Sequence, residues 1–95
     1  MDYIQDPGHG WFKVSIKQLV QLGIADRISN YSYRRGTWAY LEEDCDLTKF
    51  FNAYHAVTGR DPKHRTRMSD RSAVRGYDRY TLGKAYASFM TRGAQ

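Results

Sequence analysis

The side chain best suited to covalent chemistry is the single cysteine, Cys45, with His9 and His55 as the histidines that could serve as its base. A thiol becomes a nucleophile when a neighbouring base or positive charge favours the thiolate. Cys45 lies instead among four carboxylates, which oppose thiolate formation. On a continuous helix the ten-residue separation from His55 would put the two side chains on different faces, about 15 Å apart along the axis. The sequence therefore predicts a buried or half-buried structural cysteine, no catalytic residue and no enzymatic activity.

Four carboxylates within five positions form a second group that could do chemistry, as oxygen ligands for Mg²⁺ or Ca²⁺. They are Glu42, Glu43, Asp44 and Asp46. The run lacks the central glycine and closing glutamate of a calcium-binding loop. A helix start accounts for its aspartates, since Asp44 or Asp46 can cap the helix that follows. The histidines and the cysteine also lack the close ligand pair of a zinc site. We therefore expect capping here, with no metal and no cofactor.

Positive charge is concentrated in the C-terminal half of the chain. Residues 51–95 carry nine Lys/Arg against three Asp/Glu, a balance of +6, whereas residues 1–50 carry six against seven. Arg65 and Arg67 alternate, as do Arg75, Tyr77 and Arg79, so strands would arrange their side chains in rows. Rows of guanidinium groups suit phosphates, and arginine is equally favoured against acidic protein surfaces. The predicted partner-binding residues are Arg34, Arg35, Trp38, Arg65, Arg67, Arg71, Arg75, Tyr77 and Arg79.

The stretch from Tyr31 to Tyr40 reads as a β-hairpin that would position part of this set. Aromatic residues two apart in each arm point to one face of a strand, and Arg35-Gly36 offers a turn because glycine accepts positive φ. The aromatic rings fit either a half-buried sheet face or an exposed surface of rings and arginines that binds bases or a protein.

Two helices are well marked. Ser15 to Gly23 opens with a capping box formed by Ser15 and Gln18, and Gly23 is its stop. The second helix follows the acidic run and carries an apolar stripe that we expect to be the main core contact. The stripe consists of Leu47, Phe50, Phe51, Tyr54 and Val57, and Gly59 with Asp61-Pro62 ends the helix.

The remaining segments have weaker patterns. Met1 to Gly10 reads as an irregular lead-in, and Trp11 to Val14 as a short strand. Ile24 to Asn30 fits one helical turn. After Lys63, the stretches HRTRMSD and RSAVRGYDRY each permit a polar strand, with a turn at Asp70-Arg71. Thr81 to Met90 places Leu82, Ala85, Tyr86 and Phe89 at helical spacing, which predicts a C-terminal helix.

Together these elements predict one α+β domain over residues 1–95, with the order strand, helix, hairpin, helix, two strands and a terminal helix. We expect a largely antiparallel sheet with helices on one face. The 95 residues contain one cysteine, no apolar run long enough to cross a membrane and no basic-then-apolar leader. These features predict a cytoplasmic protein that has no membrane contact.

Three segments resemble a group of small uncharacterised proteins carried by phages, plasmids and integrated mobile elements. They are HGWFKV (His9 to Val14), YSYRRG (Tyr31 to Gly36) and YLEEDCD (Tyr40 to Asp46), within roughly the first half of the chain. The group has no assigned activity, so no catalytic residues carry over. The resemblance implies a role in the conflict between mobile elements and host defence, the setting of anti-CRISPR proteins, and hence a binding inhibitor of a host CRISPR effector protein or complex. The alternative is a small basic nucleic-acid-binding accessory or regulatory protein that uses the Arg-rich C-terminal half.

Overall fold

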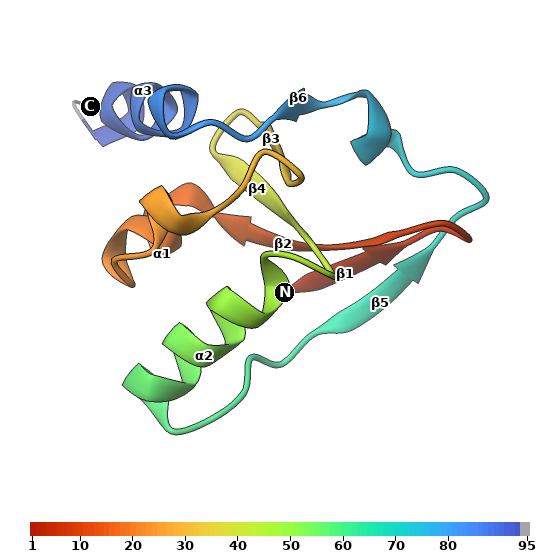
Figure 1. The fold of residues 1–95 in the computed structure, drawn as a ribbon, viewed down its shortest axis with the longest axis horizontal. Coiled ribbons are helices and arrows are strands. Elements are labelled where there is room, and N and C mark those ends of the chain that lie inside the picture. The colour runs from red at the N-terminus through yellow and green to blue at the C-terminus, as the bar shows by residue number, and fades with distance from the viewer. Residues whose placement is uncertain (94–95) are drawn as a thin grey trace.

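The computed structural model describes residues 1–93, with side chains up to Ala87, and these residues form one sheet and three α-helices (Figure 1). The strands are β1 (Asp2–Gln5), β2 (Gly10–Ser15), β3 (Tyr33–Arg35), β4 (Trp38–Glu42), β5 (Arg65–Met68) and β6 (Asp78–Arg79). The helices are α1 (Ile16–Gln21), α2 (Leu47–Thr58) and α3 (Leu82–Gly93), with short 3₁₀ turns η1 (Ala25–Arg27) and η2 (Ala73–Gly76). The strand order is β5-β1-β2-β4-β3-β6, in which only the β1–β5 pairing is parallel among the described residues. The predicted α+β class is confirmed.

The sheet has two faces of different character, because successive residues of a strand point to opposite sides. Phe12, Val14 and Leu41 lie on the face that we call the helix face, where they pack with the helices around the buried Phe50 of α2. On the opposite face a smaller cluster forms around Trp11. The helix face therefore contains the main core, as the apolar stripe of α2 predicts.

The first ten residues are not an irregular lead-in as predicted, since Asp2–Gln5 forms β1 beside β2. Tyr3 packs against the main core and Ile4 against the cluster on the other face, so this short strand contributes to both. At Gly10, an added Cβ would overlap the Tyr3 hydroxyl, which donates a hydrogen bond to Glu43. The Tyr3 side chain that lies over this position thus requires glycine here.

The helix boundaries follow local signals in most respects. The Ser15 hydroxyl accepts a hydrogen bond from Gln18 N at 3.1 Å, as the capping box predicts, and Gly23 and Gly59 follow α1 and α2 with φ of 72°. In the stripe of α2, Phe50 is fully buried and Phe51 is half-buried, but Val57 is 73% exposed. The stripe extends beyond the core because the last turn of α2 projects past the sheet (Figure 1).

The hairpin differs from its prediction in its turn and in where its first arm begins. Arg35 pairs with Trp38 in the ladder, so the loop is Gly36-Thr37 rather than Arg35-Gly36. Gly36 has a φ of 58° at the first loop position, which a two-residue hairpin of this kind requires. Tyr31 precedes β3 and is exposed.

The C-terminal half departs most from the sequence prediction. The stretch 65–68 forms β5 as expected, but it pairs with β1 at one edge of the sheet, and the two-residue β6 pairs with β3 at the other edge (Figure 1). The predicted second strand is therefore mostly the 3₁₀ turn η2 within a crossover between the edges. Val74, the one aliphatic side chain larger than alanine in this crossover, is buried against Trp11 and Tyr40 and thereby holds η2 on the sheet.

The predicted terminal helix is present as α3 and buries Ala85 against the main core. Phe89, the last position of its predicted pattern, lies outside the residues whose side chains are described. Within the described chain, every helix is too short or too polar to cross a membrane.

Candidate binding face and pocket

The register of the sheet brings cations and rings from both halves of the chain onto the face opposite the helices. Directly paired residues share a face, so Arg35 lies beside Trp38, and Arg79 of the edge strand lies beside Tyr33. We call this surface the arginine face; it comprises Lys13, Tyr33, Arg35, Trp38, Arg65, Arg67, Arg75, Tyr77 and Arg79. It includes seven of the nine predicted partner-binding residues and adds Lys13 and Tyr33, whose alternation within their strands was the available signal.

Cation–π contacts organise much of this face. Among the described residues, Lys13 lies 4.4 Å from the ring centroid of Trp38, Arg79 4.6 Å from that of Tyr33, Arg35 5.1 Å from that of Tyr77, and Arg75 5.5 Å from that of Trp11. Each such contact contributes about 0.5–1 kcal/mol at an exposed site. Stacking occupies one flat side of a guanidinium and leaves its N–H groups in the plane, where they can bind phosphate or carboxylate.

The edge of the face at β5 carries a second cationic group. Arg65 and Arg67 both contact the Asp2 carboxylate, with Nε–O distances of 3.0 and 3.3 Å, and their side chains are 75% and 61% exposed. The hydrogen bond from Arg65 lowers the pKa of Asp2, as does the charge of Arg67. Two guanidinium groups share one carboxylate here, so a net positive charge remains at this edge of the sheet.

Arg75 has a largely structural position. Its Nε and Nη2 donate to both oxygens of the buried Asp6 at 2.6 and 2.8 Å. Asp6 also accepts hydrogen bonds from the backbone N–H groups of Gly8, His9 and Ser72. The Arg75 hydrogen bond and these amides hold the pKa of Asp6 well below its usual range. We call this set of hydrogen bonds to one carboxylate the Asp6 hub. It fastens the crossover between β5 and β6 to the β1–β2 turn.

Two predicted residues are not brought to the arginine face by the ladder. Arg34 is paired opposite Ala39 and so points to the helix face, where its Nη1 lies 3.5 Å from the Asp78 carboxylate. Arg71 is exposed in the crossover between β5 and η2. Strand register places Arg34 on the opposite face from the other predicted arginines, and Arg71 lies outside the strands.

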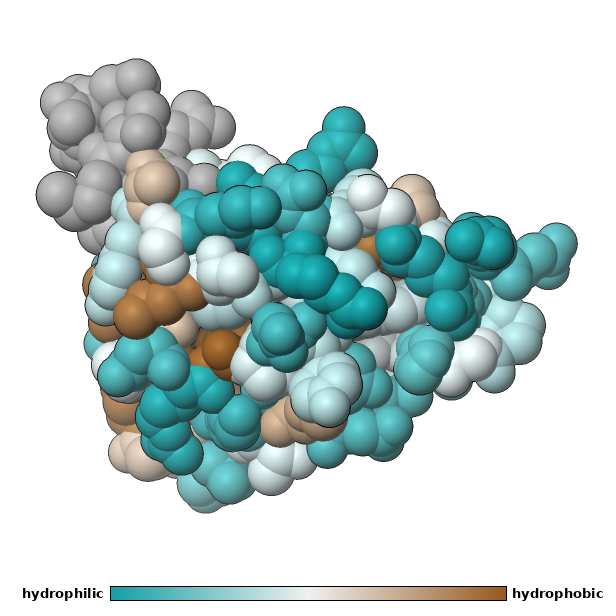
Figure 2. All heavy atoms as spheres, turned by 45° about the horizontal axis from the view of Figure 1, so that its top comes forward, coloured by the Kyte–Doolittle hydropathy of each residue, from teal (hydrophilic) through white to brown (hydrophobic). Residues whose placement is uncertain are grey.

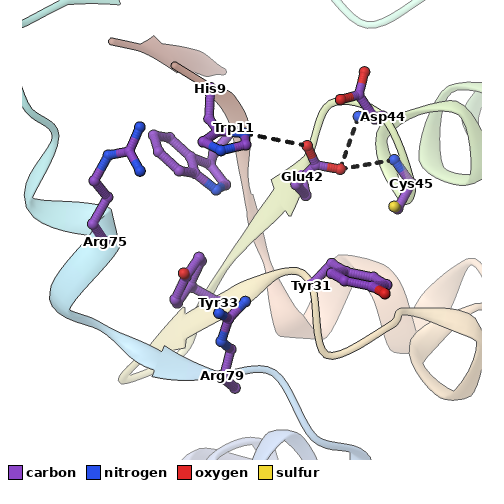
Figure 3. A pocket seen from close by; sticks show the side chains of 9 residues that line it. All are labelled: His9, Trp11, Tyr31, Tyr33, Glu42, Asp44, Cys45, Arg75 and Arg79. Atoms are coloured by element: carbon purple, nitrogen blue, oxygen red, sulfur yellow. Dashed lines mark hydrogen bonds and ion pairs between the residues drawn. The ribbon is translucent and has the colours of Figure 1, made fainter. Parts of the chain in front are cut away.

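A pocket of about 420 Å³ opens at the side of the arginine face that adjoins the start of α2 (Figure 3). Its lining residues are His9, Trp11, Tyr31, Tyr33, Glu42, Asp44, Cys45, Arg75 and Arg79. Aromatic rings form part of its wall, with Glu42 on one side and the two arginines on the other. The pocket thus combines flat apolar surfaces with groups of both charges.

Two buried polar groups face this pocket. Trp11 is only 2% exposed, and its Nε1 has no hydrogen-bond partner among the described residues. Glu42 Oε2 accepts 2.9 Å hydrogen bonds from the backbone N–H groups of Asp44 and Cys45, while Oε1 lies 3.9 Å from Nδ1 of His9. Figure 3 shows the nitrogen edge of the indole and the Glu42 carboxylate on the same side of the cavity.

In the acidic run, Asp46 does not cap α2 through its side chain as predicted. Asp46 occupies the N-cap position of α2, yet within the described chain its side chain makes no cap hydrogen bond to the helix. Its fully buried carboxylate accepts hydrogen bonds from Ser29, Ser32 and Lys49 instead, which fastens the segment before β3 to the start of α2. The capping prediction was wrong about this side chain because a tertiary partner competes with the helix N-terminus.

Among the residues whose side chains are described, one group of potential metal ligands emerges only from the fold. His9, Glu42 and Glu43 each place a ligand atom within 4.8 Å of the others. Two of these groups already have partners, since Glu42 holds the backbone of its own turn and Glu43 accepts the Tyr3 hydroxyl. The residues are 34 positions apart at most and show no ligand spacing in the sequence.

No protein-family model, curated protein or solved structure matches this chain. The resemblance to mobile-element proteins stays a prediction. Cys45, at the pocket rim, is half-buried, and burial together with Glu42 raises the pKa of its thiol. A protonated thiol is a poor nucleophile, so Cys45 is not activated for covalent chemistry.

Proposed function

We propose that this protein is a non-enzymatic binding protein whose arginine face holds single-stranded nucleic acid, either free or exposed in a host nucleoprotein complex. The observation that carries the proposal is the row of cation–π pairs across one face of the sheet, flanked by Arg65 and Arg67 at the β5 edge. Proteins that hold single strands combine a cationic track for the backbone with rings on which bases stack. This face supplies both.

The arrangement of elements favours a single strand over a duplex. The helices pack on the opposite face, so the arginine face presents a sheet with rings rather than a helix that could enter the major groove. Trp38 is 43% exposed and Tyr31 62% exposed, so both rings remain accessible for stacking. In the view of Figure 2, hydrophilic residues dominate and apolar residues form small separate patches, which suits a charged ligand more than an apolar partner.

The test is a salt titration of binding to oligouridylate and oligothymidylate, with a double variant Arg35→Glu/Arg79→Glu. Both residues are exposed, so the change should cost little beyond their cation–π contacts, about 0.5–1 kcal/mol each. Removing two phosphate contacts should weaken binding and reduce the slope of log K against log salt by about 1.4. The matched control is Lys17→Glu/Arg27→Glu, which makes the same charge change at exposed positions of α1 and η1. Equal losses in both variants would indicate a nonspecific charge effect and refute the assignment of this face.

Inhibition of a host CRISPR effector is the second candidate function. The mobile-element resemblance supports it, and so does the capture of Asp2 by Arg65 and Arg67, because the same pair could engage an acidic protein surface. Interference assays against a panel of CRISPR types test this candidate. Inhibition by the wild type and the Lys17→Glu/Arg27→Glu control, lost in Arg65→Glu/Arg67→Glu, would support it. If a purified effector is captured while bare nucleic acid is not, the partner is the protein complex.

A further inference from the structure

We infer that the pocket beside Glu42 is a subsite for a single guanine base of the bound strand. This inference rests on the proposed function and adds a base preference to it. The pocket adjoins the arginine face and shares Tyr33, Arg75 and Arg79 with it, so a strand that follows the cations passes the pocket mouth. Its volume of about 420 Å³ falls in the range of small-molecule sites.

The indole N–H of Trp11 is a buried donor in a residue that lines the pocket. A buried donor without a partner is rare in folded proteins, because it has lost its hydrogen bond to water. Trp11 is 2% exposed, and its Nε1 is unpartnered among the described residues while facing the pocket (Figure 3). A ligand that places an acceptor atom there would satisfy this group.

The Glu42 carboxylate is held in place through one of its two oxygens. Backbone N–H groups of Asp44 and Cys45 hold Oε2, which fixes the orientation of the side chain. The other oxygen is 3.9 Å from His9 Nδ1, too far for a hydrogen bond, and it lines the pocket. This oxygen has a fixed position and can accept hydrogen bonds from N–H groups of a ligand.

The donor and acceptor together select among the bases. The Watson–Crick edge of guanine presents the O6 acceptor next to two donors, N1–H and the N2 amino group, which match Trp11 and Glu42 respectively. Uracil offers one donor in the corresponding place and should bind more weakly. Cytosine and adenine present a ring nitrogen acceptor that would face the carboxylate. Single-stranded bases are commonly read at this edge while stacked on aromatic side chains, and Tyr31 and Tyr33 supply rings in the wall.

The experiment uses dodecamers of uridine that carry one central guanine, adenine or cytosine, together with the unsubstituted oligomer. In a Trp38→Phe background Trp11 is the only tryptophan, so its fluorescence reports occupancy of the pocket. We expect the guanine oligomer to bind about tenfold more tightly than the adenine and cytosine oligomers and to quench Trp11 most strongly. Calorimetry on the wild type, with both tryptophans present, checks the affinities.

The decisive variant is Glu42→Gln, with Glu43→Gln as its matched control. A glutamine oxygen can still accept the hydrogen bonds from Asp44 and Cys45, so the turn should keep its shape, but the pocket then presents an N–H₂ donor. Glu43→Gln removes the same charge one residue along, outside the pocket lining. The guanine preference should vanish in Glu42→Gln and persist in Glu43→Gln, and melting curves establish that both variants are folded.

The outcomes separate the two proposals. If all four oligomers bind the wild type equally, or if Glu42→Gln keeps the preference, the guanine subsite is refuted while nucleic-acid binding stands. If none of the oligomers binds, the proposed function itself fails and the subsite fails with it. A preference for adenine or cytosine would also overturn the hydrogen-bond assignment to Trp11 and Glu42.

Discussion

Replacing Asp46 tests whether this carboxylate is a helix cap or a buried anchor. In the variant Asp46→Ala, the Ser32 hydroxyl and the Ser29 amide lose their acceptor, and Lys49 loses its 2.9 Å ion pair. Lys49 is partly exposed and can return to water. The other donors are partly or fully buried and cannot be compensated so easily. We therefore expect a loss well above that of an ordinary cap.

The magnitude follows from the hydrogen bonds that cannot be replaced. A hydrogen bond to a charged group contributes about 1.5–3 kcal/mol, and two at the lower value give a loss of about 3 kcal/mol in the free energy of unfolding. For a domain of this size that corresponds to a fall in Tm of roughly 12–24 °C. An N-cap aspartate alone would cost about 1 kcal/mol. The two interpretations therefore differ by more than the error of a denaturation experiment.

The assay is urea denaturation and thermal melting of Asp46→Ala, Asp46→Asn and the control Asp44→Ala. Asp44 is exposed, so its loss should change stability by no more than about 0.5 kcal/mol. Asp46→Asn keeps one acceptor oxygen and should lie between the other two. A cost of 1 kcal/mol or less for Asp46→Ala would refute the buried-anchor reasoning and restore the capping interpretation.

The same carboxylate makes stability depend on pH. Burial by itself raises the pKa of Asp46, but hydrogen bonds from Ser32, Lys49 and Ser29 outweigh burial and hold the pKa below its ordinary value. The stabilisation is thus present above about pH 4, the pKa of an aspartate in the unfolded chain, and is lost as the pH falls through the folded pKa. In Asp46→Asn, the part of the acid sensitivity that comes from this group should be absent.

Two further predictions concern the core and the Asp6 hub. Phe50→Ala should lower the free energy of unfolding by about 3–5 kcal/mol in urea denaturation. Val57→Ser, at an exposed position of the same helix, should change it by no more than about 0.5 kcal/mol. Similar costs for the two variants would contradict the observed core. The hydrogen bond from Arg75 lowers the pKa of Asp6, so this pair stabilises the fold above about pH 4 and less as the pH falls. Arg75→Gln should lower Tm at pH 7 and narrow the Tm difference between pH 7 and pH 3, and an unchanged difference would contradict the assignment.

Local signals in the sequence were sufficient to predict where several helices and strands lie. The hydroxyl of Ser15 and the glycine at position 23 define α1 within a few residues, because capping and positive φ depend only on nearby backbone. The alternation around Trp11 and the spacing of Phe50 identified the strand and helix of the main core for the same reason. These features were predictable from periods of two and 3.6 residues.

The pairing of strands that are distant in the sequence could not be predicted from such local patterns. β5 pairs in parallel with β1, more than 60 residues earlier, and β6 pairs with β3 at the other edge, so the apparent hairpin of residues 64–80 does not form. The basic segment has almost no aliphatic side chains, and a strand without a clear apolar face has a weakly specified register. Its place is determined by partners that β1 and β3 provide.

The candidate site shows the same division. Its residue types were evident from the sequence, since arginines and aromatics alternate in the segments that contain Arg35, Trp38, Arg65 and Arg67. Which of them share one face, and that Trp11 and Glu42 line one pocket, was decided by the tertiary structure. Sequence periodicity specifies which side of an element is apolar. The contacts between elements depend on packing and hydrogen bonding over long sequence separations, which no local pattern encodes.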